Sequence, residues 1–203
     1  MNQEEAVPEF KIYTSSVTGA LRQGEIISGL IQTRLQANSV GSDEPIVDFE
    51  THPLAIVVTQ DCDLEQDFKA RNLEENTPPC TSNKLIPNIL FCQIISAEEL
   101  KQLNSLNSKL WERVKINKDE RYHFFQKVTP NDDSRGEGLS ELGLDFKRYF
   151  TIPTEEVYTR IKFDAERRCC LLSPYLEHFS TRFAYYQFRI ALPQDHLSES
   201  VNL

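Results

Sequence analysis

Residues 52–64 read His-Pro-Leu-Ala-Ile-Val-Val-Thr-Gln-Asp-Cys-Asp-Leu and change from apolar to polar halfway along. The first half, Leu54 to Val58, is a short apolar run rich in β-branched side chains, which predicts a strand buried on both faces. Polar side chains then crowd the carboxyl end of that strand: Thr59, Gln60, Asp61, Cys62 and Asp63. These five residues are therefore the first candidates for contact with a ligand or a partner.

The rest of the chain has the composition of a globular protein. It has 203 residues, of which 39% are hydrophobic and 26% are charged. This length and composition are sufficient for a proper hydrophobic core. We predict a single domain over residues 1–203, with residues 1–20 and 194–203 at its periphery.

Charge and cysteine content narrow the class of protein further. The formal net charge of −9 repels nucleic-acid phosphates, so nucleic acid is a disfavoured partner unless a local basic patch overrides this repulsion. The five cysteines form no C-x-x-C pair and no zinc-finger spacing, so we expect no metal and no cofactor. The chain starts without signal-peptide features and has no apolar run of about 18 residues, which indicates a cytoplasmic protein with reduced thiols and no membrane contact.

Apolar runs and turn residues predict an alternation of strands and helices. Strands are expected at residues 10–13, 22–32, 46–49, 54–58, 88–95, 121–128, 142–152 and 168–172. Helices are expected after residue 63, after residue 96, near residues 110–111, at residues 154–161 and between residues 173 and 193. This order predicts an α+β fold: a small, mostly antiparallel β-barrel or curled sheet with two or three packed helices.

Three helix starts carry recognisable caps. Ser96 followed by Glu99 is a capping box, Asp63 is the expected cap of the helix after the central strand, and Ser173 precedes a proline suited to a first turn. The last helix is expected to be amphipathic, with one apolar stripe: Leu176, Phe179, Phe183, Tyr186 and Ile190.

Cys62 has two interpretations. As a nucleophile it would need a nearby base, for which His52 and His123 are the candidates. Its acidic neighbours would raise the pKa of the thiol, and the favoured interpretation is a small buried residue that closes the strand. The four histidines are too scattered for a local metal motif, and His178 is expected to pack beside the apolar stripe of the last helix.

The neighbouring polar residues have alternatives of the same kind. Asp61 and Asp63 have the spacing of magnesium ligands, but a helix cap at Asp63 and a turn at Asp61 explain them as well. Thr59 and Gln60 must find partners at the end of a buried strand, so they either hold a neighbouring loop or meet a ligand.

A second group of candidates is basic. Lys147 and Arg148 lie among aromatic residues, a pattern suited to single-stranded nucleic acid, and Arg168 would extend the same positive groove. Strict alternation would place Phe146, Arg148 and Phe150 on one face of a strand, and a half-buried strand with solvated cations explains the pattern equally.

Residues 22–26, Arg-Gln-Gly-Glu-Ile, followed by a loop and by residues 52–58, resemble the opening of the PemK/MazF-type growth-inhibitor toxins. The resemblance covers residues 22–95 at most and implies an SH3-like β-barrel that cleaves mRNA. His52 stands where the family has a catalytic arginine before proline, and no residue matches its catalytic threonine, so we expect the fold to carry over and not the catalysis. The Gln-x-Cys-Asp-Leu segment at residues 60–64 resembles uncharacterised bacterial proteins.

Three functions follow as hypotheses. The first is a non-catalytic binding or regulatory protein of bacterial type, whose protein partner or small ligand contacts residues 59–63. The second is a ribonuclease-like or RNA-binding barrel that uses Lys147, Arg148 and Arg168. The third is a hydrolase that depends on Cys62 or on the aspartates at positions 61 and 63.

Overall fold

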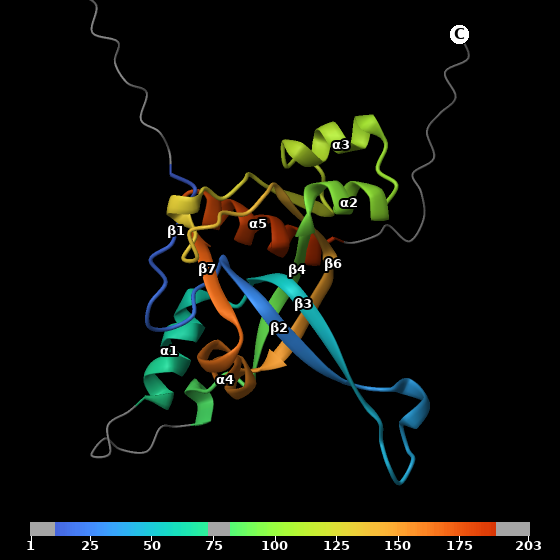
Figure 1. Ribbon diagram of the computed structural model, residues 1–203, viewed down its shortest axis with the longest axis vertical. Helices are drawn as coiled ribbons and strands as arrows, with labels where there is room; N and C mark the ends of the chain where they lie inside the picture. Colours follow the sequence, from blue (N-terminus) through green and yellow to red (C-terminus); the bar gives the residue numbers. More distant parts are fainter. Residues whose placement is uncertain (1–10, 73–81, 190–203) are drawn as a thin grey trace, which may run out of the picture.

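The computed structural model describes residues 11–72 and 82–189 (Figure 1). Within these ranges seven strands form one sheet: β1 (Tyr13–Thr14), β2 (Glu25–Leu35), β3 (Val47–Val57), β4 (Asn88–Ser96), β5 (Tyr122–Phe125), β6 (Leu142–Pro153) and β7 (Glu166–Leu171). They lie in the order β1-β7-β2-β3-β4-β6-β5, and all neighbouring pairs are antiparallel. The α+β class and the antiparallel sheet are confirmed. The sheet is open, with β1 and β5 as its edges, so the structure does not contain the expected barrel.

Five α-helices accompany the sheet in the described ranges: α1 (Asp61–Arg71), α2 (Ala97–Leu103), α3 (Ser108–Lys115), α4 (Thr154–Phe163) and α5 (Tyr175–Gln187). Helices are confirmed at all five expected places, but the expectation that two or three of them pack was too low, because each of α1 to α5 contributes a buried residue to a core cluster. Three single-turn 3₁₀ helices complete the elements: η1 (Ala37–Ser39), η2 (Ser82–Lys84) and η3 (Pro130–Asp132).

The helix starts follow their caps, with two corrections. The Ser96 hydroxyl accepts a hydrogen bond from the Glu99 backbone N–H at 3.1 Å, as the capping box predicts. α1 begins three residues earlier than expected, with Gln60 as its N-cap, so Asp63 lies in the first turn and is not the cap. Similarly, Pro174 is the N-cap of α5, which starts one residue later than predicted.

The sheet is buried on both faces, as the apolar run in β3 predicts. Ala55 and Val57 point into a core cluster closed by α1 and α4, whereas Ile56 points into the cluster on the opposite face, which α5 closes. A third cluster packs α2 and α3 against β5. The stripe on α5 is confirmed for the described residues, since Phe179 and Tyr186 are buried, while Ile190 lies outside them.

A bulge in β6 changes which side chains share a face. Four residues of β6, 145–148, oppose Gln93 alone, because Cys92 pairs with Tyr149 and Ile94 with Leu144. The strand therefore places Phe146 in the cluster under α5 and Phe150 in the cluster under α1 and α4. The prediction that Phe146 and Phe150 lie on the same face was wrong, because strict alternation fails across a bulge.

Asp145 holds this bulge in place. One carboxylate oxygen accepts a hydrogen bond from the Lys147 backbone N–H at 3.0 Å and another from Arg121 Nε at 2.9 Å. The second oxygen lies 2.5 Å from Arg121 Nη2. The carboxylate thus ties the irregular part of β6 to the start of β5.

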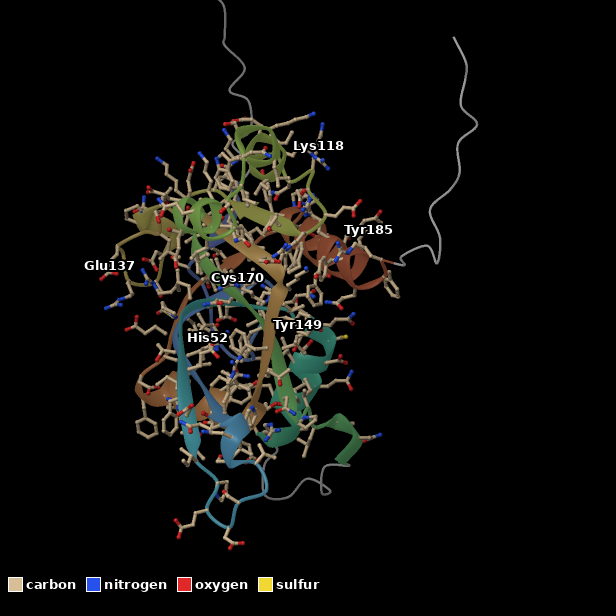
Figure 2. All side chains as sticks on the ribbon, turned by 90° about the vertical axis from the view of Figure 1, so that its right-hand side faces the viewer. His52, Lys118, Glu137, Tyr149, Cys170 and Tyr185 are labelled. Carbon is tan, nitrogen blue, oxygen red and sulfur yellow. The ribbon has the colours of Figure 1, made fainter. Side chains whose placement is uncertain are left out.

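The hairpin of β2 and β3 continues well beyond the body of the sheet. β7 pairs with β2 only as far as Ser28, and β4 pairs with β3 only from Leu54 onward. We call residues 29–53 the arm; its far end, around the loop between β2 and β3, extends past the rest of the described chain (Figure 1 and Figure 2). The strand predicted at residues 46–49 and the central strand are one continuous strand in the structure, β3. Gly29, at the base of the arm, has a φ of +80°, and a Cβ there would lie 3.0 Å from the Asp164 carbonyl oxygen, so a larger residue would be strained.

Candidate functional site

Two of the five polar side chains after β3 accept hydrogen bonds from backbone N–H groups. The Thr59 hydroxyl accepts a hydrogen bond from the Leu90 N–H at 2.8 Å and so continues the pairing of β3 with β4. Asp61 Oδ1 accepts a hydrogen bond from the Gln23 N–H at 2.5 Å, and Oδ2 lies 3.4 Å from Arg22 Nη2. Both side chains therefore fix the loops around the start of α1.

The other three polar residues are open to solvent. Gln60, Cys62 and Asp63 are all exposed, and Cys62 Sγ lies 3.7 Å from both Gln60 Oε1 and Asp63 Oδ1. The favoured expectation that Cys62 is buried was wrong, because α1 begins at Asp61 and turns this thiol outward. Beside them, Asp61 and Arg22 help to line a shallow depression of about 300 Å³.

Neither of the two histidines proposed as a base for Cys62 is placed to act on it. His52 is 2% exposed and stacks on Phe150 with 3.7 Å between ring centroids, while His123 lies buried in β5. Within residues 11–72 and 82–189, neither imidazole forms a hydrogen bond with the Cys62 thiol. In the same ranges, no three His, Cys, Asp or Glu side chains are grouped so that they could hold a metal ion.

The three basic candidates do not come together. Arg168, on β7, is buried and forms a bidentate pair with Asp133 at 2.7 and 2.6 Å, and three other strands separate β7 from β6 in the sheet. Lys147 and Arg148 are exposed on the bulge of β6, and in the described part of the chain neither forms an ion pair. Arg168 therefore does not contribute to an exposed groove with them.

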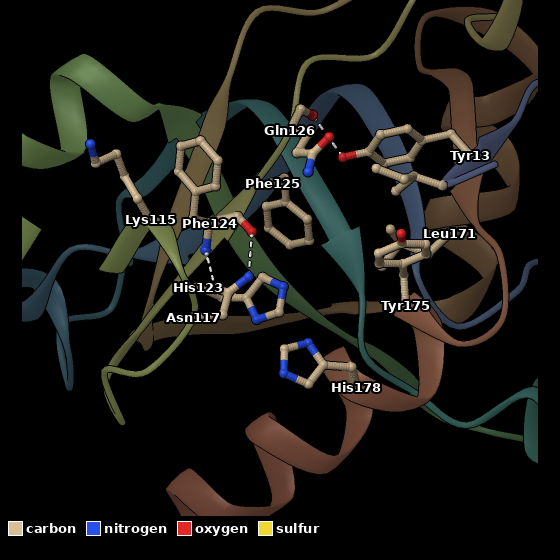
Figure 3. Close-up of a pocket in the computed structure, with 11 residues that line it drawn as sticks. Tyr13, Lys115, Asn117, His123, Phe124, Phe125, Gln126, Leu171, Tyr175 and His178 are labelled. Carbon is tan, nitrogen blue, oxygen red and sulfur yellow. Dashed lines mark hydrogen bonds between the residues drawn. The ribbon is translucent and has the colours of Figure 1, made fainter. Parts of the chain in front are cut away.

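A cavity of about 90 Å³ lies where β1, β5 and the start of α5 meet (Figure 3). Its polar lining comes from widely separated parts of the chain: Tyr13, Asn117, His123, Gln126, Tyr175 and His178. Figure 3 shows the His123 and His178 rings next to each other, and their centroids are 5.6 Å apart. The expectation that His178 simply packs beside the apolar stripe missed this arrangement.

The pKa values of both histidines are lowered. His123 is 4% exposed; burial, followed by the charge of Arg182 and then by His178, lowers its pKa well below the usual range. Burial and Arg182 also lower the pKa of His178, which is exposed at the edge of the cavity. In the described ranges the Nδ1 atom of His123 is buried and has no hydrogen-bond partner. Groups with a perturbed pKa that line a cavity are candidates for a functional site.

Arg182 is the charge behind these histidines. Its guanidinium donates hydrogen bonds to the backbone carbonyls of Asn117, Asp119 and Tyr122, the last at 2.6 Å. No carboxylate in residues 11–72 and 82–189 forms a salt bridge with it, and burial lowers its pKa. The cavity therefore lies near a partly buried positive charge that backbone carbonyls bind and that the more distant charge of Asp119 partly offsets.

The arm carries a second exposed surface. Cross-strand pairing places Leu35 opposite Val47 and Thr33 opposite Phe49 on one side of the ribbon. Leu35 is 60% exposed and Phe49 69% exposed. The opposite side is polar, with an ion pair between Arg34 and Glu50. We call the side with Leu35, Val47 and Phe49 the apolar face of the arm.

Sequence reasoning missed both the cavity and the apolar face. A single histidine in the otherwise apolar run at residues 122–125 was a signal for the cavity, because polar residues in buried strands need partners. The apolar face becomes visible only when the register of β2 against β3 is known.

No family model matches this chain, and no curated protein or solved structure matches it either. Among the helices that the structure describes, none is long and apolar enough to cross a membrane. What the protein does must therefore be inferred from its own contacts, burial and charge.

Proposed function

We propose that this chain is a non-catalytic binding protein that docks a protein partner through the apolar face of the arm. Twelve large hydrophobic side chains are exposed in the described residues, and five of them are in the arm: Leu35, Val40, Ile46, Val47 and Phe49. This concentration supports docking, because contiguous exposed apolar surface on a soluble protein is typical of an interaction site.

The charge of the arm indicates the chemistry of the partner. One basic residue, Arg34, and four acidic residues, Asp43, Glu44, Asp48 and Glu50, give residues 29–53 a net charge of −3. A second copy of the chain would bring the same negative arm and a net charge of −9, so long-range repulsion opposes self-association. We therefore propose a partner with an apolar groove bordered by Lys and Arg.

The backbone of the arm supports the same mode of binding. Beyond Ser28 and before Leu54, no strand in the described ranges pairs with the outer edges of β2 and β3. Such edges offer free N–H and C=O groups to an added strand. Partner contact would then combine backbone hydrogen bonds with burial of Val47 and Phe49.

Site-specific photo-crosslinking in cells that produce the protein tests this proposal. A photoreactive phenylalanine analogue at position 49 reports on the apolar face, and the same analogue at Asp48 is the matched control on the polar face. We expect crosslinks to one basic protein from position 49 only. With that protein purified, Val47→Asp is expected to weaken binding by about tenfold or more, since a charge at an apolar contact costs at least about 1.4 kcal/mol. Crosslinks between copies of this chain, or equal yields from both positions, would contradict the proposal.

The exposed part of the 59–63 turn remains a second candidate contact of the same binding protein. Gln60, Cys62 and Asp63 project from the first turn of α1, where their side chains are free to meet a partner. If Cys62→Ala and Asp63→Ala both leave binding of the crosslinked partner unchanged, this turn is not part of the recognition surface.

RNA binding is a second candidate function, because Lys147 and Arg148 present two exposed cations that no described carboxylate pairs, next to Tyr149, which is 49% exposed. Exposed cations and an aromatic ring suit single-stranded RNA. A gel shift at low salt tests it, with Lys147→Glu as the variant and Lys69→Glu, which alters a cation already paired with Glu65 at 2.5 Å, as the control. Absence of a shift at low salt, where electrostatic binding is strongest, would exclude this function.

A further inference from the structure

The cavity beside β5 contains a hydrogen-bonding group that the described chain leaves unsatisfied. A neutral imidazole has one N–H donor and one acceptor nitrogen, and the buried Nδ1 atom of His123 has no hydrogen-bond partner within residues 11–72 and 82–189. A buried polar atom without a partner is unfavourable. His52 shares this deficit, but its ring stacks on Phe150 and does not line the cavity. His123 differs because open volume lies next to it.

The surrounding charges favour an anion in that volume. Arg182 lies near the cavity on α5 and, after burial, is the second cause that lowers the pKa of both His123 and His178; such a positive charge would repel a metal cation. Lys115 also lines the cavity, although Glu112 pairs with it at 2.8 Å. The lining includes no carboxylate and no thiol.

Size and wall chemistry select the kind of anion. About 90 Å³ accommodates several water-sized groups, since one water needs roughly 10–15 Å³ measured in this way. The polar rings of His123 and His178 face walls that include the apolar side chains of Ile12, Phe125 and Leu171. A small anion with a short apolar tail matches this combination better than a fully hydrated ion such as phosphate.

We propose that this cavity is a binding site for a small organic carboxylate, which accepts hydrogen bonds from His123 and His178 while its short tail lies against the apolar wall. The site is independent of the arm and of the partner that the arm docks. The bound carboxylate offsets the charge of Arg182.

Binding is expected to be coupled to proton uptake. The cavity lining around the two rings includes Tyr13 from β1, Lys115 from α3 and Tyr175 from α5, and Arg182 of α5 lowers the pKa of both rings. Asp119, before β5, acts on Arg182, but no carboxylate lines the cavity. A carboxylate raises the histidine pKa values toward or above their ordinary value, and affinity therefore increases as the pH falls from about 7.5 to 5.5.

Calorimetry and NMR on the full chain test the proposal with butyrate as the probe. Butyramide, which has the same shape without the charge, is the control ligand. We expect butyrate to bind, butyramide not to bind, and the His123 and His178 ring signals to shift with butyrate alone. We expect His178→Ala to weaken butyrate binding by about tenfold, the loss of one charge-assisted hydrogen bond, and Thr181→Ala, on an exposed position of α5, to leave it unchanged.

Four results would overturn the proposal, and none of them depends on the arm. The first two are equal binding of butyrate and butyramide, and tighter binding of Zn²⁺ than of butyrate. The third is butyrate binding that does not change in His178→Ala. The fourth is an absence of butyrate binding below about 100 mM, a limit that corresponds to the weak affinity of a single ion contact. Since His178 is exposed, its replacement does not disturb the core, and failure of the variant to fold is not expected.

Discussion

The turn at residues 59–63 and the cavity beside β5 both set polar groups against the apolar core, yet the chain treats them differently. At the turn, Thr59 and Asp61 accept hydrogen bonds from the backbone N–H groups of Leu90 in β4 and of Gln23 in a distant loop. At the cavity, Nδ1 of His123 has no partner in the described residues, and none of their carboxylates forms a salt bridge with the nearby Arg182. The polar residues of the turn thus partly serve to hold backbone segments together. The single histidine in the apolar strand β5 is the better candidate for contact with a ligand.

Arg168 is a buried charged residue whose partner, Asp133, lies within the protein. Replacing it with Ala leaves Asp133 buried without its cation, and we expect a loss of about 3 kcal/mol in the free energy of unfolding, measured by urea denaturation. Arg34→Ala, which breaks an exposed bridge on the arm, is the control and should cost less than about 1 kcal/mol. Similar losses in the two variants would contradict the assignment of Arg168 to the core.

The dependence of stability on pH provides a second test of the Arg168–Asp133 ion pair. The Arg168 guanidinium lowers the pKa of Asp133 to about 2, below the value of 3.8 that applies to the unfolded chain. The contribution of this pair to stability is therefore complete above about pH 4 and is lost as the pH falls toward 2. Arg168→Ala should reduce this loss on the acid side, and Arg34→Ala should not.

Asp61→Ala tests whether the turn holds backbone segments together. The change removes the acceptor of the Gln23 N–H and the contact with Arg22, and we expect it to reduce the free energy of unfolding by about 2 kcal/mol. Asp63→Ala removes the same charge from the same helical turn, but its side chain is exposed, so a change of less than about 0.5 kcal/mol is expected. Equal effects would show that the backbone contacts of Asp61 do not matter.

His123→Leu addresses the opposite side of the comparison. The substitution removes a buried imidazole with an unpartnered nitrogen, so we expect it to stabilise the fold by about 1 kcal/mol. We also expect it to abolish butyrate binding, because residues that serve a binding site often reduce stability. His52→Leu, the control, removes a second unpartnered imidazole and should leave butyrate binding intact. If His123→Leu destabilises the protein strongly, His123 has a structural partner in solution and is not held for a ligand.

The smallest expected effect concerns Cys62. Cys62→Ser should change the free energy of unfolding by less than about 0.5 kcal/mol, but remove one fast-reacting thiol in a native titration with a thiol reagent. Cys92, Cys169 and Cys170 should react slowly, because they are buried and burial raises their thiol pKa values, that of Cys170 to about 12. An unchanged number of fast thiols would mean that the turn is covered.

Local patterns were enough to predict much of the fold. The apolar run in β3, the Ser96 cap and the stripe on α5 depend on neighbouring residues, and the structure contains all three. Contacts between distant residues were not predictable in this way. Nothing near Thr59 indicates that Leu90 will be its donor. The choice between a barrel and a curled sheet could not be made either, because no local pattern marks the strands that form an open edge.

The candidate sites were harder to predict than the fold, because they too depend on contacts between distant residues. His123 and His178 are 55 positions apart and meet only because α5 folds back over β5. The apolar face of the arm depends on the register between β2 and β3, which the loop length does not reveal. Arg168 does not lie with Lys147 and Arg148 because it forms an ion pair with Asp133. Asp133 is in a loop that was not part of the basic pattern.

The bulge in β6 also affects how the strand responds to changes in its length. On either side of residues 145–148 the pairing with β4 is regular, so each half of β6 keeps its own alternation. A one-residue deletion within a regular half would exchange the inward and outward positions of every later residue in that half. Within the bulge, Phe146 is buried and Asp145 holds the backbone, but Lys147 and Arg148 are exposed. We therefore expect a one-residue deletion at position 147 or 148 to be tolerated better than a deletion in either regular half of β6.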